Sequence, residues 1–175
     1  MILFFLACLA DIRPDAVKSA GDVPANQERG RALLSAAADA HGGLDAWNNH
    51  QTATVVGIDD WRGLLGRLAS PWPAATTGIH LEQRLHTFDS RVVFTDTRAE
   101  GETWGISDWT TWTRDTDGSV KVKKHNDAAF MLPTMQYFVE FPFRIQEAPI
   151  VTVAGEETIA GVTYDRVVAT WESLK

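Results

Sequence analysis

Hydrophobic and polar residues alternate with a period of two along most of this chain, and two segments depart from that period. The first is residues 26–41, NQERGRALLSAAADAH, where apolar side chains recur at helical spacing and Asn26 stands in an N-cap position. Gly42 and Gly43 follow, where helices commonly end in a left-handed residue. We therefore predict a helix over residues 26–41, a short second turn at 44–50, and a linker over residues 11–26.

From Gln51 onward, the alternation predicts β-strands. Short connections, and the hairpin signal Thr116-Asp117-Gly118, imply antiparallel pairing. Residues 61–73 are rich in Trp, Gly and Pro and are predicted to form a loop. The pattern thus predicts an α+β fold with an antiparallel sheet. Six alternating segments, residues 51–59, 78–88, 91–97, 101–107, 109–115 and 119–125, are expected to supply about five strands, and residues 149–172 two or three more.

The second departure is residues 126–145, NDAAFMLPTMQYFVEFPFRI, an unusually apolar and aromatic segment. Pro133 and Pro142 forbid a sheet ladder through its middle and limit any helix to a few turns. The segment either plugs one side of the sheet or covers, as a lid, an apolar cavity that a ligand fills. Methionines adapt to variable apolar partners, which suits a lid, and both interpretations stay open. The expected ligand contacts are Phe130, Met131, Met135, Phe138 and Phe141, with Trp104 contributing from the sheet.

Length and charge exclude several classes of protein. A chain of 175 residues fits one domain with a substantial core, which we place at residues 27–175. A net charge of −7 argues against a nucleic-acid surface, which needs clustered Lys and Arg. The last predicted strand runs into Trp171, and the sequence stops at Lys175 without a polar tail or cap, which would leave an exposed sheet edge, so we also expect truncation at the C-terminus.

Cys8 is the only cysteine, so an intramolecular disulfide and the usual zinc clusters are excluded. The start MILFFLAC resembles a bacterial lipoprotein signal over residues 1–10, in which the cysteine is acylated, although no basic residue precedes the apolar run. We expect an exported protein of a bacterial cell envelope, either periplasmic or membrane-anchored through Cys8. A chance apolar start is the alternative.

The sequence contains few residues in patterns typical of catalysis. The sequence contains no nucleophile elbow, P-loop or dinucleotide fingerprint. His80, Glu82 and His86 share one face of a predicted strand and could form a metal-dependent hydrolase site, but Arg84 lies between them on that face. Residues 115–118 resemble the start of a calcium loop, and a hairpin turn explains them better. We expect no catalytic residues, no metal and no cofactor.

Three stretches together resemble the LolA/LolB-like superfamily of bacterial envelope lipoprotein and lipid carriers. They are AHGGLDAWN, YFVEFPFRI and VTVAGEETIAGVTYDRVVATW. The resemblance implies a strongly curved, unclosed antiparallel half-barrel, with helices on a concave face and further strands after Trp171. It also implies an apolar cavity that holds acyl chains without catalysis. A lipidated Cys8 would suggest an anchored member, whereas a shuttling carrier must be soluble.

The resulting functional prediction is a non-enzymatic, exported binding protein for a lipid or a lipid-modified protein. Apolar burial would drive binding, and lid motion would drive release, because a dry pocket would offer no polar group to titrate. The alternative is a structural or interaction lipoprotein of the envelope, whose concave face is filled by its own side chains.

Overall fold

The computed structural model describes residues 23–96 and 98–171, and these form two compact units. One unit runs from Asp45 to Phe141, and the other combines the residues up to Leu44 with those from Pro142 onward. The expected α+β class is confirmed, with an N-terminal helix and an open, unclosed antiparallel sheet. The assignment of residues 27–175 to one domain stays a prediction.

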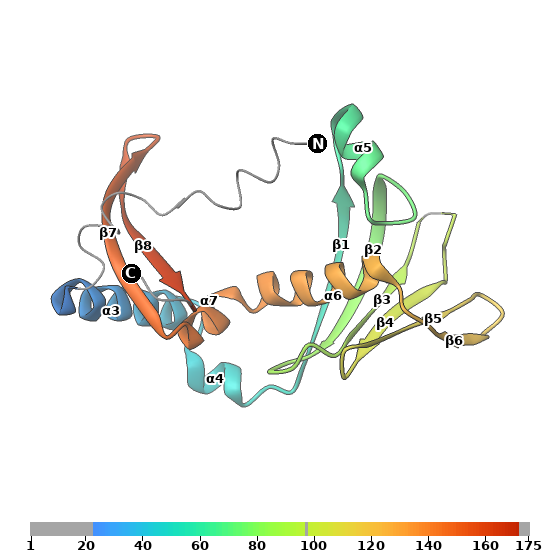
Figure 1. Ribbon diagram of the computed structural model, residues 1–175, viewed down its shortest axis with the longest axis horizontal. Coiled ribbons are helices and arrows are strands. Elements are labelled where there is room, and N and C mark those ends of the chain that lie inside the picture. Colours follow the sequence, from blue (N-terminus) through green and yellow to red (C-terminus); the bar gives the residue numbers. More distant parts are fainter. Residues whose placement is uncertain (1–22, 97, 172–175) are drawn as a thin grey trace. The chain divides into compact units, whose positions relative to one another are not determined.

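The Asp45–Phe141 unit is built on a six-stranded sheet in which each strand pairs antiparallel with the next in sequence (Figure 1). Strands β1 and β6 therefore form its edges. The predicted hairpin turn joins β5 to β6, where Gly118 adopts a positive φ of 85°. The strands are β1 (Thr52–Asp60), β2 (Thr76–Arg84), β3 (Ser90–Phe94), β4 (Thr103–Ser107), β5 (Thr110–Arg114) and β6 (Val120–Val122).

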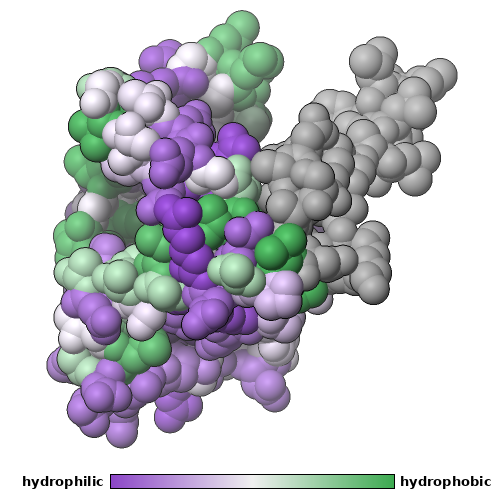
Figure 2. Space-filling view, turned by 90° about the vertical axis from the view of Figure 1, so that its left-hand side faces the viewer, coloured by the Kyte–Doolittle hydropathy of each residue, from purple (hydrophilic) through white to green (hydrophobic). Residues whose placement is uncertain are grey.

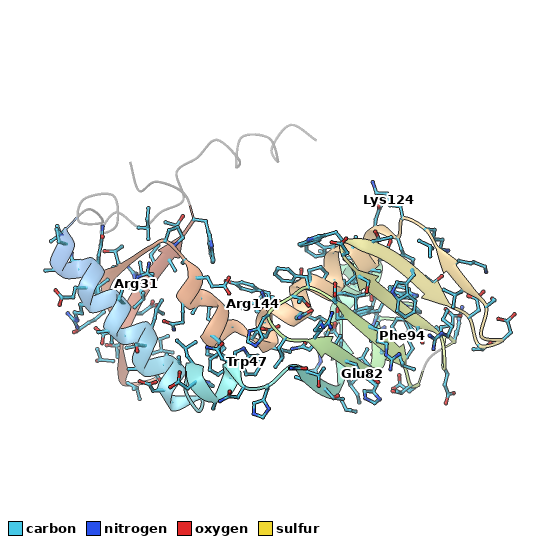
Figure 3. All side chains as sticks on the ribbon, turned by 90° about the horizontal axis from the view of Figure 1, so that it is seen from below. Arg31, Trp47, Glu82, Phe94, Lys124 and Arg144 are labelled. Atoms are coloured by element: carbon cyan, nitrogen blue, oxygen red, sulfur yellow. The ribbon has the colours of Figure 1, made fainter. Side chains whose placement is uncertain are left out.

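One face of this sheet carries the core and is called the inner face. The alternation predicted from sequence places Leu81, Val92 and Trp104 in register across three neighbouring strands. Helix α6 (Asn126–Val139) lies across this face and buries Ala128, Met131 and Leu132 against it (Figure 1). Phe94 of β3 belongs to the same core and is labelled in Figure 3.

Hydrogen bonds hold α6 at both of its ends. The backbone N–H of His125 donates to the Thr111 hydroxyl at 2.9 Å, and the His125 Nδ1 accepts from the Ala128 N–H at 3.3 Å as an N-cap. Near the other end, Gln136 is fully buried, and its Nε2 donates to the carbonyls of Arg84 at 2.7 Å and Thr87 at 2.8 Å. The helix is thereby fixed to β5 and to the turn after β2.

Helix α5 (Gly63–Ala69) lies within residues 61–73, so the prediction of a loop over that whole range is wrong. Its leucines are strong helix formers, yet Leu64, Leu65 and Leu68 are each more than three-quarters exposed. They form the apolar cluster at the top of Figure 2. At seven residues with two glycines, α5 is too short for the helical period of its leucines to be recognised in the sequence.

The other unit packs helix α3 (Pro24–Ala40) against a hairpin of β7 (Ile150–Ile159) and β8 (Val162–Thr170). The helix begins at Pro24, so the prediction of an N-cap at Asn26 and of a linker reaching residue 26 is wrong. Proline suits a first helical position because its fixed φ matches the helix and its missing N–H is not needed there. The predicted helix end is confirmed, with Gly42 and Gly43 at φ of 105° and 86°.

Three short helices complete the described chain: α4 (Leu44–Asn48), α7 (Phe141–Arg144) and the single turn η1 (Ile145–Glu147). None of the helices found among residues 23–96 and 98–171 has both the length and the apolar character needed to cross a membrane.

Candidate binding site

An apolar pocket of about 540 Å³ lies between α6 and strands β1 and β2, entirely within the Asp45–Phe141 unit. This volume falls in the range of roughly 300–1,000 Å³ that is typical of small-molecule sites. Most of the wall is aliphatic, aromatic or thioether in character. The lining residues are Val55, Gly57, Ile58, Asp59, Trp61, Ile79, Phe130, Met131, Thr134, Met135, Phe138 and Val139.

Gly57 contributes open space to the pocket, because it has no side chain. Gly57 pairs directly with Ile79 across the β1–β2 ladder, and Val55 pairs with Leu81 in the adjacent row. In that adjacent row Val55 packs against the core, whereas a Cβ built on Gly57 meets no atom within 4 Å. Helix α6 packs against β3, β4 and β5. A missing side chain near the β1 edge therefore leaves open space beside the helix.

Four of the six predicted ligand contacts line this pocket. Phe130 and Phe138 are each 68% exposed, which is far more than large apolar residues usually show in a helix packed on a sheet. Met131 is buried with only 6% exposure, and Met135 is partly buried against the core. One side of α6 thus borders the pocket while the other enters the core.

The other two predicted contacts lie elsewhere in the unit. Trp104 is only 8% exposed and packs in the core, with its ring centroid 4.9 Å from that of Phe94 and 4.2 Å from that of His125. Phe141 is 43% exposed and packs edge-on against Tyr137 at 5.9 Å. Neither residue belongs to the pocket wall.

The pocket wall also contains an acidic residue, which the sequence analysis did not anticipate. The Asp59 Oδ2 accepts hydrogen bonds from the indole Nε1 of Trp72 at 2.6 Å and from that of Trp61 at 3.1 Å. The expectation of a pocket without a titratable group is therefore wrong. The other polar wall residue, Thr134, donates its hydroxyl to the Phe130 carbonyl at 2.6 Å.

The structure does not assemble the histidine-based metal site. Glu82 is bound by Arg91 of β3, at 2.9 Å from Nε and 2.6 Å from Nη2 (Glu82 is labelled in Figure 3). His86 lies beyond the end of β2, where its Nε2 is 3.2 Å from the His50 carbonyl. Among the residues described, no three His, Cys, Asp or Glu side chains are placed to hold a metal ion.

The Asp115 region forms a hairpin turn, as expected, and its charges are satisfied locally. Lys121 Nζ donates to the Asp115 carboxylate at 2.6 Å, and this bond lowers the pKa of Asp115 below its ordinary value. The Asp117 carboxylate accepts from the Ser119 N–H at 2.8 Å, and this bond likewise lowers the pKa of Asp117. Cys8, the predicted lipidation site, lies outside the described residues.

Three of the pocket residues that sequence reasoning missed, Gly57, Asp59 and Trp61, lie on or just after β1. Gly57 offered one usable signal, because a glycine inside a strand often marks a site where a ligand or another backbone approaches closely. Asp59 and Trp61 gave none, since their convergence with Trp72 depends on a loop whose path the sequence does not reveal.

Comparisons of this chain with protein-family models, with curated proteins and with solved structures returned no match.

Proposed function

We propose that this protein is a non-enzymatic binding protein that holds a hydrophobic ligand, the acyl chain of a lipid or of a lipid-modified protein, in the pocket between α6 and β1–β2. The observation that carries the proposal is the pocket wall itself, where Phe130 and Phe138 stand 68% exposed beside the space left by Gly57. Exposed aromatic side chains around an apolar cavity are typical of a ligand site.

Burial of hydrocarbon would provide the driving force, at about 0.8 kcal/mol for each methylene group removed from water. The anchoring of α6 through Thr111 and Gln136 supports a fixed helical wall. Entry and release then proceed past the exposed side chains of Phe130 and Phe138, with no displacement of the helix as a whole.

Export, and membrane anchoring through an acylated Cys8, remain part of the proposal. They rest on the apolar start of the sequence and on the resemblance to the LolA/LolB-like carriers. The intact mass of the protein recovered from bacterial membranes tests them: a mass increased by a lipid group at a mature N-terminal Cys8 supports anchoring, and an unmodified chain beginning at Met1 contradicts it.

The second candidate is a structural or interaction protein with a self-filled sheet. It is favoured by the core over β2–β4, where Trp72, Phe94 and Trp104 pack against one another at ring-centroid distances of 4.9 to 5.8 Å. That part of the inner face is covered by side chains of the protein itself. The two candidates therefore differ in what occupies the space beside β1.

Filling the pocket from β1 distinguishes them. Gly57→Phe adds a large side chain at the pocket wall, at a position where its Cβ meets no atom within 4 Å. Val56→Phe is the matched control, because Val56 is 72% exposed and does not line the pocket. Binding of the neutral fluorescent probe N-phenylnaphthylamine, and mass spectrometry of co-purified lipid, are the measurements.

The proposal expects probe binding and co-purified lipid in the unmodified protein and in Val56→Phe, and at least about a tenfold loss of probe affinity in Gly57→Phe. Absence of both probe binding and lipid from the unmodified protein, or equal binding by the two variants, contradicts it. The self-filled alternative predicts that none of the three proteins binds the probe.

A further inference from the structure

Asp59 is an unusual wall residue for a pocket that holds hydrocarbon. Burying a charge in apolar surroundings is costly, so a carboxylate persists there only where hydrogen bonds support it. Residues of β1 alternate between half-buried and exposed, and Asp59 shares the half-buried face with Val55 and Gly57. It therefore points to the side of the sheet that carries the pocket.

The indole groups fix how this carboxylate is presented. Both hydrogen bonds, from Trp61 at 3.1 Å and from Trp72 at 2.6 Å, end on Oδ2. Trp72 is itself 5% exposed and packed in the core, so this donor has little freedom to move. Oδ1 has no hydrogen-bond partner among the described residues, and it is the atom that remains able to accept a bond from a ligand.

The rest of the wall offers nothing that would bind an anion. No Lys, Arg or His is among the described residues that line the pocket. The nearest basic side chain along the chain, Arg62, is bound to the neighbouring Asp60 at 2.6 Å. Asp60 belongs to the exposed set of β1 residues and also accepts from the Thr76 hydroxyl at 2.9 Å.

We infer that Asp59 selects the polar head of the bound chain, so that the pocket takes an aliphatic amphiphile that ends in a hydrogen-bond donor, an amine or an alcohol, and discriminates against a free carboxylate. This inference rests on the proposed function. A donor head bonds to the free oxygen of Asp59 while its chain lies along Ile79, Met135 and Phe138. A carboxylate head would instead meet a like charge in apolar surroundings, where screening is weak.

Three chains of equal length and different head groups test the inference: dodecylamine, dodecanol and dodecanoate. Each displaces N-phenylnaphthylamine from the unmodified protein at neutral pH, at concentrations below micelle formation. The expected order of affinity is amine, then alcohol, then carboxylate, with the amine at least about tenfold tighter than the carboxylate, as expected for a bond to a charged group. Equal affinities, or a preference for the carboxylate, would overturn the inference without any variant being needed.

Asp59→Asn and Asp60→Asn form a matched pair, because they remove the same charge from adjacent residues on opposite faces of β1. Asparagine at 59 retains an oxygen that accepts from both indoles and turns an N–H₂ group toward the ligand. In Asp59→Asn, the ratio of the affinity for the amine to the affinity for the carboxylate then falls to about one or below. In Asp60→Asn, this ratio stays unchanged. An equal loss in both variants would show only a general effect of charge and would overturn the role of Asp59.

The outcomes separate this inference from the function on which it rests. If neither the probe nor any of the three chains binds the unmodified protein, the proposed function fails. If all three chains bind equally and Gly57→Phe blocks them, the binding function stands and only the selection by Asp59 is rejected.

Discussion

The two long helices, α3 and α6, each lie against strands of their own unit, and a glycine has opposite consequences in the two places. On α3, Gly30 brings the helix so close to β7 that an added Cβ would stand 3.0 Å from the Val151 Cγ1 and 3.2 Å from Thr152 backbone atoms. Beside α6, Gly57 lies on the strand, and an added Cβ meets nothing within 4 Å. One glycine closes a helix–sheet interface, and the other leaves it open.

The difference shows that residue type alone does not decide whether an interface forms a cavity. At the α3 interface, the absence of a side chain on Gly30 allows the helix to approach β7 closely. Arg31 of α3 also donates hydrogen bonds, from Nη1 to the Gln146 carbonyl at 3.0 Å and from Nη2 to the Pro149 carbonyl at 2.8 Å (Arg31 is labelled in Figure 3). At α6, the helix packs on β3, β4 and β5, and the open space at Gly57 on β1 stays unfilled.

The largest expected effect comes from removing a core contact between α6 and the sheet. Leu132 is fully buried, so Leu132→Ala is expected to lower the free energy of unfolding by about 3 kcal/mol, from lost burial and the cavity left behind. Urea denaturation measures it. Phe130→Ala is the control on the same helix, because the exposed Phe130 should change stability by less than about 0.5 kcal/mol. Equal losses in both variants would show that the two sides of α6 do not differ.

The α3 interface should be destabilised by adding a side chain at Gly30, whereas the α6 interface is destabilised by removing one. Gly30→Leu forces a side chain against Val151 and the Thr152 backbone, and we expect a net loss of about 2 kcal/mol in the free energy of unfolding despite the better helix propensity of leucine. Glu28→Leu, at an exposed position of the same helix, should leave stability nearly unchanged. An unaltered urea midpoint in Gly30→Leu would mean that the close contact is not maintained in solution.

A smaller effect, on binding and not on stability, is expected at the pocket edge. Phe138→Ala should weaken the binding of N-phenylnaphthylamine by about tenfold, equivalent to about 1.4 kcal/mol, because a ligand loses an aromatic surface that it would cover. Trp109→Ala is the matched control: Trp109 is 67% exposed, against 68% for Phe138, and packs instead on Phe88 at 5.3 Å. Unchanged probe affinity in Phe138→Ala would remove that residue from the site.

The smallest effect is expected at the β5–β6 hairpin, outside both helix interfaces. The bond from Lys121 lowers the pKa of Asp115 in the folded state, so its stabilisation is present above the ordinary pKa and is lost as pH falls through the lowered value. Asp115→Asn should therefore lower the melting temperature slightly at neutral pH, with the difference from the unmodified protein vanishing in acid. The pair is exposed and screened by solvent, so a large shift would contradict this account.

The sequence pattern was sufficient for the class of fold and for one side of the pocket. Alternation in the strands predicts which strand faces are buried, and the apolar, aromatic composition of residues 126–145 assigned Phe130, Met131, Met135 and Phe138 to a common site. Trp104 was misplaced because its neighbour Trp72 reaches it from a loop, and no periodicity describes a loop. The sequence leaves open whether residues 126–145 form a plug or a lid, and in the structure α6 combines a buried core face with a face on the pocket.

The opposite side of the pocket could not be predicted, since it depends on a side chain that is absent. The space at Gly57 depends on where α6 lies, and the helix packs on β3, β4 and β5, which are not adjacent to β1 in the sheet. The role of Asp59 likewise requires two tryptophans from outside its strand. Such features become visible only when tertiary distances are known.

Gly57 also has a genetic consequence. A single base change converts a glycine codon to valine, and valine suits a strand interior better than glycine, which weakens a strand by roughly 0.5–1 kcal/mol. Because the space at Gly57 is open, this mutation meets no steric barrier. Selection for folding alone would therefore favour Gly57→Val. In a population selected first for stability and then for ligand uptake, Gly57→Val should become more frequent in the first stage and be lost in the second.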